Sequence, residues 1–125
     1  MKQQYMEAWI IPSGKPRMTQ RDRWKKRPAV MKYRRYADEL RKEALTQNFE
    51  LGEQLDIQFF IPIPKSWSLK KRKAHVGLSH KQRPDLDNLI KAVQDILLSE
   101  DSRIWKVYAS KRWSEHGLII INNLK

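Results

Sequence analysis

The stretch "EQLDIQFFIPI", residues 53–63, decides the fold class because its side chains alternate in character. Leu55, Ile57 and Phe59 project to one side of an extended chain, and the Asp and Gln between them project to the other. This period of two is typical of a β-strand with one buried face. Pro62 lacks the backbone N–H that a strand ladder needs, so the pairing is expected to end there.

Periodic stretches on either side of this strand predict the remaining elements. We expect a strand at 4–12, a helix from Val30 to Asn48, a helix within 81–101, a strand at 103–113 and a last strand at 118–121, with basic loops at 13–29 and 64–84. This β-α-β-α-β-β order predicts one small α/β (α+β) domain over residues 1–125, with a mixed sheet and two main helices. Trp105 and Trp113 are both expected in its core.

The charge of the chain narrows the class of function. With 26 Lys and Arg against 14 Asp and Glu, the net charge of +12 indicates an anionic partner. Nucleic acid is the first expectation and an anionic membrane surface the second. No aliphatic run approaches the ~20 residues that span a bilayer, and no segment resembles a signal peptide, so no membrane association is expected. The absence of cysteine excludes disulfides and cysteine-based zinc sites and suits a cytoplasmic protein.

The acids are concentrated instead of dispersed. Residues 62–84 contain none, whereas the next seventeen residues contain five, Asp85, Asp87, Asp95, Glu100 and Asp101. An apolar stripe of helical period runs through the same segment, and Asp87, Lys91 and Asp95 fall on its opposite side. The sequence therefore predicts an acidic helix face next to a strongly basic loop.

Two interpretations of these acids follow from the residues alone. Asp85 at a helix N-cap would stabilise the helix by ~1 kcal/mol, and Asp87 with Lys91 would form an i, i+4 pair of a few tenths of a kcal/mol. Capping uses one acid, however, and clustered carboxylates repel one another unless a cation lies between them. Hard oxygen ligands of this kind suit Mg²⁺, and a metal within a basic surface is what phosphodiester hydrolysis requires.

A family resemblance favours the second interpretation. The run "RPDLDNLIKAVQDIL", residues 83–97, followed by "SED", residues 99–101, resembles the RusA-type Holliday junction resolvases, whose signature is D-x-D-N-x-x-K on a helix and then an acidic pair. The segment "GKPRMT", residues 14–19, and the helix with Tyr33 and Tyr36 resemble the basic N-terminal region of phage and prophage members.

The resemblance implies roles for individual residues. It places the metal-binding aspartates at Asp85, Asp87 and Asp101 and the essential catalytic lysine at Lys91. The acidic pair reads Glu-Asp here, where the family has Asp-Asp, and it lies closer to Lys91, so this sequence departs from the family pattern at the third ligand. Between Glu100 and Asp101, Asp101, the second residue of the pair, is favoured as that ligand.

The implied activity is that of a homodimeric, Mg²⁺-dependent endodeoxyribonuclease, with Mn²⁺ as a substitute. Such an enzyme resolves four-way DNA junctions in recombination and repair by cutting two opposed strands, and a two-fold dimer matches the symmetry of that substrate. Two other classes stay open. One is a basic nucleic-acid-binding module without catalysis, and the other is a Mg²⁺ nuclease of other branched DNA, such as flaps or nicks.

Contacts to the DNA backbone are expected from the basic loops, although such loops can also be merely solvated. The expected DNA-binding residues are Lys15, Arg17, Arg21, Arg23, Lys25, Lys26, Lys70, Lys71, Arg72, Lys73, Lys81 and Arg83. Trp24 and Trp67 either cover the core or stack on an unpaired base. His75 and His80 lack a matched third zinc ligand, and Asp95 is expected to pair with Lys91.

Overall fold

The computed structural model describes residues 2–17, 27–98 and 100–125, with the side chain of Asp101 excepted. The elements are β1 (Tyr5–Ala8), α1 (Pro28–Thr46), β2 (Gln54–Pro62), α2 (Leu69–His75), α3 (Leu86–Leu97), a 3-10 turn (Asp101–Arg103), β3 (Lys106–Ser114) and β4 (Leu118–Asn123). The strands form one mixed sheet in the order β1-β4-β2-β3, in which β2 and β3 are parallel and the other pairs antiparallel. The predicted single α+β domain is confirmed.

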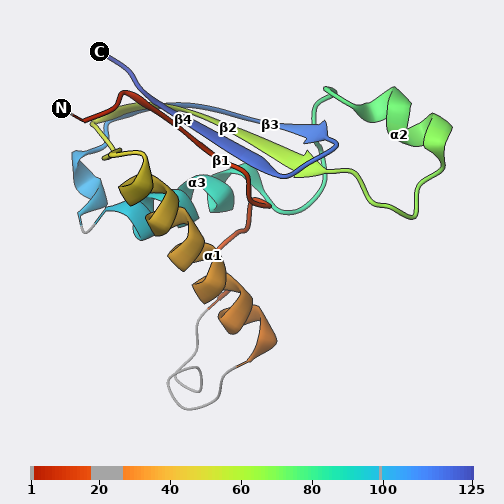
Figure 1. Cartoon of the computed structure of the whole chain (residues 1–125), viewed down its shortest axis with the longest axis horizontal. Helices are drawn as coiled ribbons and strands as arrows, with labels where there is room; N and C mark the ends of the chain where they lie inside the picture. The colour runs from red at the N-terminus through yellow and green to blue at the C-terminus, as the bar shows by residue number, and fades with distance from the viewer. Residues whose placement is uncertain (1, 18–26, 99) are drawn as a thin grey trace.

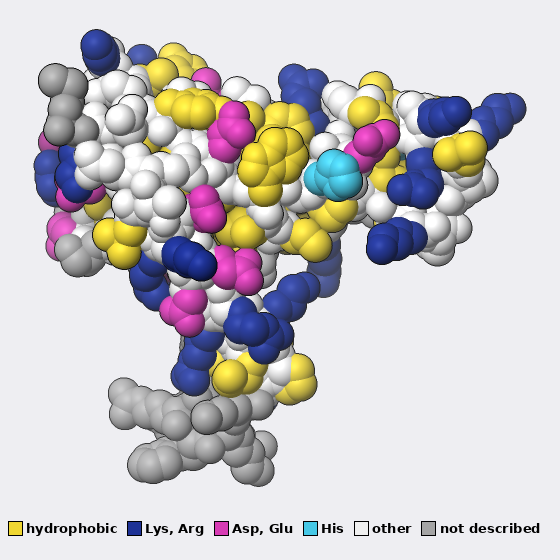
Figure 2. Space-filling model, viewed as in Figure 1, with side chains coloured by type: hydrophobic (Ala, Val, Ile, Leu, Met, Phe, Trp, Pro, Cys, Tyr) yellow, Lys and Arg dark blue, Asp and Glu magenta, His cyan; other side chains and the backbone are white. Residues whose placement is uncertain are grey.

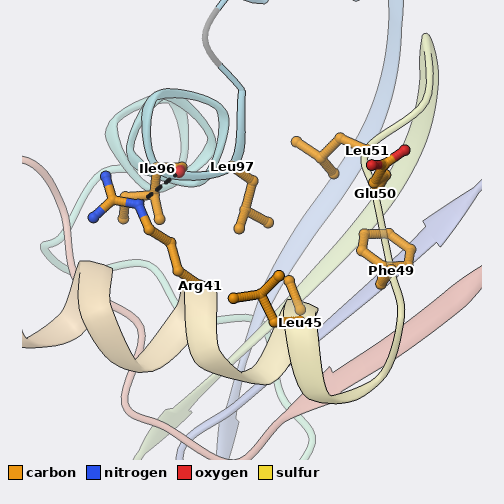
Figure 3. A pocket seen from close by; sticks show the side chains of 8 residues that line it. Arg41, Leu45, Phe49, Glu50, Leu51, Ile96 and Leu97 are labelled. Carbon is orange, nitrogen blue, oxygen red and sulfur yellow. Dashed lines mark hydrogen bonds between the residues drawn. The ribbon is translucent and has the colours of Figure 1, made fainter.

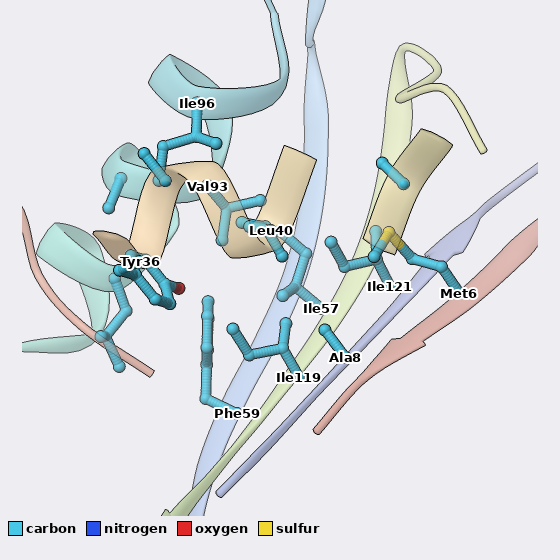
Figure 4. Close-up of a cluster of buried hydrophobic side chains, with 14 of the residues drawn as sticks. Met6, Ala8, Tyr36, Leu40, Ile57, Phe59, Val93, Ile96, Ile119 and Ile121 are labelled. Carbon is cyan, nitrogen blue, oxygen red and sulfur yellow. The ribbon is translucent and has the colours of Figure 1, made fainter. Parts of the chain in front are cut away.

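The predicted strand is the centre of this sheet. β2 pairs with β3 on one side and with β4 on the other, and its side chains alternate between buried and half-buried along its whole length. Leu55, Ile57 and Phe59 have no exposed surface, and they face α1 and α3, which lie together on one side of the sheet (Figures 1 and 4). Each such side chain contributes roughly 1.5–3 kcal/mol of hydrophobic free energy.

Both main helices begin and pack as their sequences dictate. Pro28 occupies the first turn of α1, where its missing N–H costs nothing, and Tyr33, Ala37 and Leu40 recur on the buried side. α3 buries a stripe of Leu89, Ala92, Val93 and Ile96. Within the described ranges, neither helix nor any other is long and apolar enough to span a bilayer.

The predicted loop at 64–84 contains a helix that the sequence analysis missed. α2 begins after Ser68, whose Oγ accepts a hydrogen bond from the Lys71 N–H at 3.2 Å. None of its residues is buried, and it stands away from the sheet at the tip of a finger, residues 64–76 (Figure 1). Because none of its residues is buried, α2 needs no apolar helical stripe, and its sequence carries none from which to predict it.

Trp105 was wrongly predicted to lie in the core. It stands one residue before β3, at the edge of the sheet where β2 is the only neighbouring strand, and it is 66% exposed. Trp113, near the other end of β3, is 5% exposed, as predicted. The first strand is also shorter than the predicted strand at 4–12: it runs from Tyr5 to Ala8.

Replacing Ile57 by Ala should lower the free energy of unfolding by about 2–5 kcal/mol, because it leaves a cavity between the sheet and the helices. Gln58→Ala, on the opposite face of the same strand, should change it by no more than about 0.5 kcal/mol. Urea denaturation of both variants measures the difference. Equal losses would contradict the assignment of the two faces.

Candidate metal and DNA-binding site

The signature residues lie at the N-terminal end of α3. Asp85 is the N-cap residue, Asp87 lies in the first turn, and Lys91 follows one turn later. This end of α3 points toward the finger, and the N-terminal half of α1 projects from the body in another direction, downward in the view (Figure 1). The start of α3, with Asp85 and Asp87, therefore lies between two projecting parts of the molecule.

Asp85 occupies the N-cap position of α3, but its side chain does not cap the helix. The backbone of Asp85 has the extended conformation of an N-cap residue, with φ −67° and ψ 144°, yet its carboxylate makes no capping hydrogen bond. Across the described residues, neither Asp85 nor Asp87 has a salt bridge or a side-chain hydrogen bond. Both are exposed. Two hard oxygen donors thus lie close in sequence with no structural partner, which fits a divalent cation such as Mg²⁺.

The third expected ligand, Asp101, has a side chain outside the described part of the structure. Its backbone begins the 3-10 turn after α3. The neighbouring Glu100 accepts a hydrogen bond from the Ser102 N–H at 3.2 Å, so its carboxylate has a local structural use. Among the described side chains, no group of three or more His, Asp and Glu residues could hold a metal ion.

Asp95 binds two lysines. Its Oδ1 lies 3.1 Å from Lys91 Nζ, as expected, and its Oδ2 lies 3.0 Å from Lys15 Nζ. Burial opposes ionisation of Asp95, but the hydrogen bonds from Lys15 and Lys91 outweigh it, so the pKa of this carboxyl lies below its ordinary value. Asp95 therefore acts as the anionic anchor of Lys91, and both of its oxygens are occupied.

The segment at residues 14–17 packs on α3. Asn88 Nδ2 donates to the Lys15 carbonyl at 3.3 Å, and a Cβ built on Gly14 would come within 2.3 Å of the same nitrogen. A side chain at position 14 would therefore displace the Asn88 amide from this contact. Lys15, predicted to contact DNA, lies at the site itself, where its side chain is bound to Asp95 but 39% exposed.

Cations surround this site on the described surface. Arg17, Lys81 and Arg83 are exposed near the start of α3, and the finger carries Lys70, Lys71, Arg72 and Lys73. Figure 2 shows Lys and Arg side chains on the finger and along α1. The predicted contacts Arg21, Arg23, Lys25 and Lys26, together with Trp24, lie outside the described residues.

A third basic surface, which was not predicted from the sequence, lies on the N-terminal half of α1. Lys32, Arg34 and Arg35 are exposed there, and the first turn contains no acid. These three residues lie beyond the first turn, and within the described residues none of them forms a salt bridge, so their charges are available to contact an anion such as the DNA backbone. Summing charge separately over each half of the predicted helix could have revealed it.

Aromatic contacts anchor the finger to β3. The Trp67 ring lies 5.0 Å from that of Trp113 and 4.9 Å from that of His75, and Lys71 Nζ lies 4.0 Å above Trp67. The His80 ring also lies 4.3 Å from that of Trp113. Both histidines therefore pack against tryptophan rings, and Trp67 has a packing role.

An apolar cavity of about 280 Å³ lies at the opposite end of α3. It is lined by Arg41, Ala44, Leu45, Phe49, Glu50, Leu51, Ile96 and Leu97, and Arg41 Nε donates to the Ile96 carbonyl at 3.2 Å (Figure 3). Because the signature residues lie at the other end of the helix, this cavity is no part of the candidate site.

Comparisons with known proteins agree with the resemblance. The family model described as Endodeoxyribonuclease RusA matches residues 9–122. Over 69 residues the chain is 36% identical to "Uncharacterized protein YqaN" of Bacillus subtilis (strain 168), an alignment that covers 49% of this chain and 49% of that protein. The chain thus spans about half the length of this curated relative. No solved structure matches the chain.

The stability of the fold should depend on pH through His80. This side chain is 4% exposed, its Nδ1 has no hydrogen-bond partner in the described structure, and burial, followed by the charge of Lys111, lowers its pKa below 6.5. The unfolded chain then binds more protons between the lowered pKa and 6.5, so the free energy of unfolding should rise with pH through that window. Urea denaturation at a series of pH values should show a smaller rise for His80→Gln. Identical slopes for the two proteins would contradict this.

Proposed function

Because the chain belongs to the RusA endodeoxyribonuclease family, we propose that it is a divalent-metal-dependent endonuclease that resolves four-way DNA junctions. The supporting observation is the pair Asp85 and Asp87, exposed at the start of α3 without a partner in the described structure. Carboxylates on a surface meant only to bind DNA would repel phosphate. Their place among cations therefore favours an enzyme over a non-catalytic binding module.

Three aspartates would hold the metal in this proposal. Asp85 and Asp87 provide exposed carboxylates, and Asp101 is the proposed third ligand, with Mg²⁺ as the resident ion and Mn²⁺ as a substitute. Bound there, a divalent ion would supply charge neutralisation at the scissile phosphate and activation of water. Glu100 is less suited, since its carboxylate already accepts a hydrogen bond from the turn that follows α3.

Lys91 is the proposed catalytic cation. Its ammonium group is held by Asp95 at 3.1 Å, which limits the positions that its flexible side chain can adopt. A preorganised cation stabilises negative charge that develops on a phosphate without reorganising during the reaction. Lys15 binds the other oxygen of Asp95 and so brings a second positive charge to the same side of α3.

The basic surfaces would bind the arms of the junction. The finger and the N-terminal half of α1 project from the body in different directions, and the start of α3, which carries Asp85 and Asp87, lies between them (Figure 1). DNA held by both would pass across the start of α3. A four-way junction is two-fold symmetric, so we propose a homodimer that presents one site to each of two opposed strands. A nuclease of flaps or nicks would need the acids but no such symmetry.

Asp85→Asn and Asp87→Asn should each reduce cleavage of a four-way junction by about 100-fold or more, because the amide removes the negative charge that a divalent ion needs. Asn is also a good N-cap residue, so the helix should survive. Junction binding in EDTA should hold or tighten, since a charge that repels phosphate is gone. Gel assays of cutting and binding measure both effects.

Asp56→Asn is the matched control for these variants. Asp56 is half-buried in β2 between the buried Leu55 and Ile57, and therefore faces away from α3. Its substitution should leave cutting unchanged. Wild-type cleavage by Asp85→Asn in Mg²⁺ would overturn the proposed mechanism.

Replacing Lys70, Lys71, Arg72 and Lys73 together by Gln should flatten the dependence of DNA affinity on salt. Each phosphate contact contributes about −0.9 to the slope of log K against log salt, so the slope should change by up to several units. The charge-matched control replaces Lys2, Lys42, Lys106 and Lys125, which lie away from the finger. Fluorescence anisotropy at several salt concentrations compares the two proteins. An equal change in both would mean that only net charge matters.

A further inference from the structure

Lys111 in β3 makes an unusual set of contacts beside the candidate site. Its Nζ donates to the carbonyl oxygens of Gln82 at 2.5 Å and of Pro84 at 2.7 Å. Pro84 immediately precedes Asp85, so this side chain reaches across the fold to the backbone that leads into α3. The main chain of Lys111 also accepts a hydrogen bond from the His80 N–H at 3.1 Å. One strand residue therefore holds the incoming segment at three points.

The orientation of Lys111 runs against common expectations for lysine. It alternates with Arg112 and shares its side of β3 with the buried Trp113, and it is only partly exposed. Lysine is rarely placed on the covered side of a strand, and an ammonium group near the N-terminus of a helix faces the positive end of the helix dipole. The partial burial of this lysine and its position near the helix N-terminus are both unfavourable by themselves. The hydrogen bonds to the carbonyls of Gln82 and Pro84 offset this cost and indicate that the lysine is there to hold this backbone.

The same segment connects the finger to the acids. Gly77 N donates to the Trp113 carbonyl and Trp113 N donates to the Leu78 carbonyl, both at 2.9 Å, so residues 77–80 run along β3. Residues 82–84 then leave the strand and enter α3. The described structure holds their carbonyls through Lys111. Asp85 does not cap α3 with its carboxylate, so the helix itself does not fix that side chain.

We infer that Lys111 is a positioning residue for the metal site. Its ammonium group fixes the backbone of residues 82–84 and thereby sets how Asp85 and Asp87 project from the start of α3. The inference rests on the proposed function, because it assigns these two carboxylates to a divalent ion. Residues that orient metal ligands without touching the metal typically change metal affinity by ~10–100-fold when they are replaced.

The test compares Lys111→Met, which keeps the unbranched side chain but removes the ammonium group and its charge, with Lys111→Arg, which keeps the charge. The first readout is the affinity of the protein for Mn²⁺ in the absence of DNA, which electron paramagnetic resonance measures. Lys111→Met should weaken Mn²⁺ binding by about 10-fold or more, and Lys111→Arg should recover part of the loss. The Mg²⁺ concentration for half-maximal cutting should rise in parallel, while junction binding in EDTA stays within about twofold, because the basic surfaces are intact.

Lys106→Met is the matched control. Lys106 lies in the same strand, but its ammonium group lies over the Tyr108 ring at 5.2 Å, outside the candidate site. It should bind Mn²⁺ as the wild type does. Wild-type Mn²⁺ affinity in Lys111→Met would overturn the inference while leaving the proposed nuclease in place.

Two further outcomes are decisive. If Lys111→Met and a second neutral variant, Lys111→Gln, both fail to fold, Lys111 is a structural residue and the positioning role is wrong. If the wild type itself binds no Mn²⁺ and cuts no junction, the proposed function fails, and it does so independently of any Lys111 variant.

Discussion

Burial of one face of β2 constrains where the other elements can lie. The apolar side chains of β2 need a cover, and α1 and α3 provide it from the same side of the sheet (Figure 4). α3 must then run across that face with its own stripe of Leu89, Val93 and Ile96 turned inward. This orientation leaves Asp87 and Lys91 on the outer side of the helix, and so the packing of the core determines where the candidate chemistry is exposed.

The acids in and beside α3 differ in whether they have partners. Asp95 is neutralised by Lys15 and Lys91, which makes it part of the scaffold, and Glu100 closes a turn. Asp85 and Asp87 take no such part within the described structure. A protein with a large excess of cations could readily have paired them, as it paired Asp95. Their availability at the point where the basic surfaces converge is the feature that an endonuclease needs and a simple DNA-binding protein does not.

Local patterns allowed the central strand, both main helices and the acidic helix face to be predicted, because a buried face repeats at the period of its own element. The same logic fails where nothing is buried. No residue of α2 is buried, and Trp105, which the sequence led us to expect in the core, is exposed. Contacts between distant segments also leave no local pattern. The approach of Gly14 to Asn88 and the reach of Lys111 to Pro84 depend on how the elements pack together, and only the fold reveals them.

The central claim is that the exposed aspartates at the start of α3 serve a metal-dependent cut in branched DNA. Its most direct test is incubation of the protein with an immobile four-way junction, each strand labelled in turn, with Mg²⁺ or with EDTA, followed by a denaturing gel. We expect symmetric cuts in two opposed strands with Mg²⁺ and intact strands in EDTA. Tight junction binding without any cut in Mg²⁺, or equal cutting in EDTA, would contradict the account.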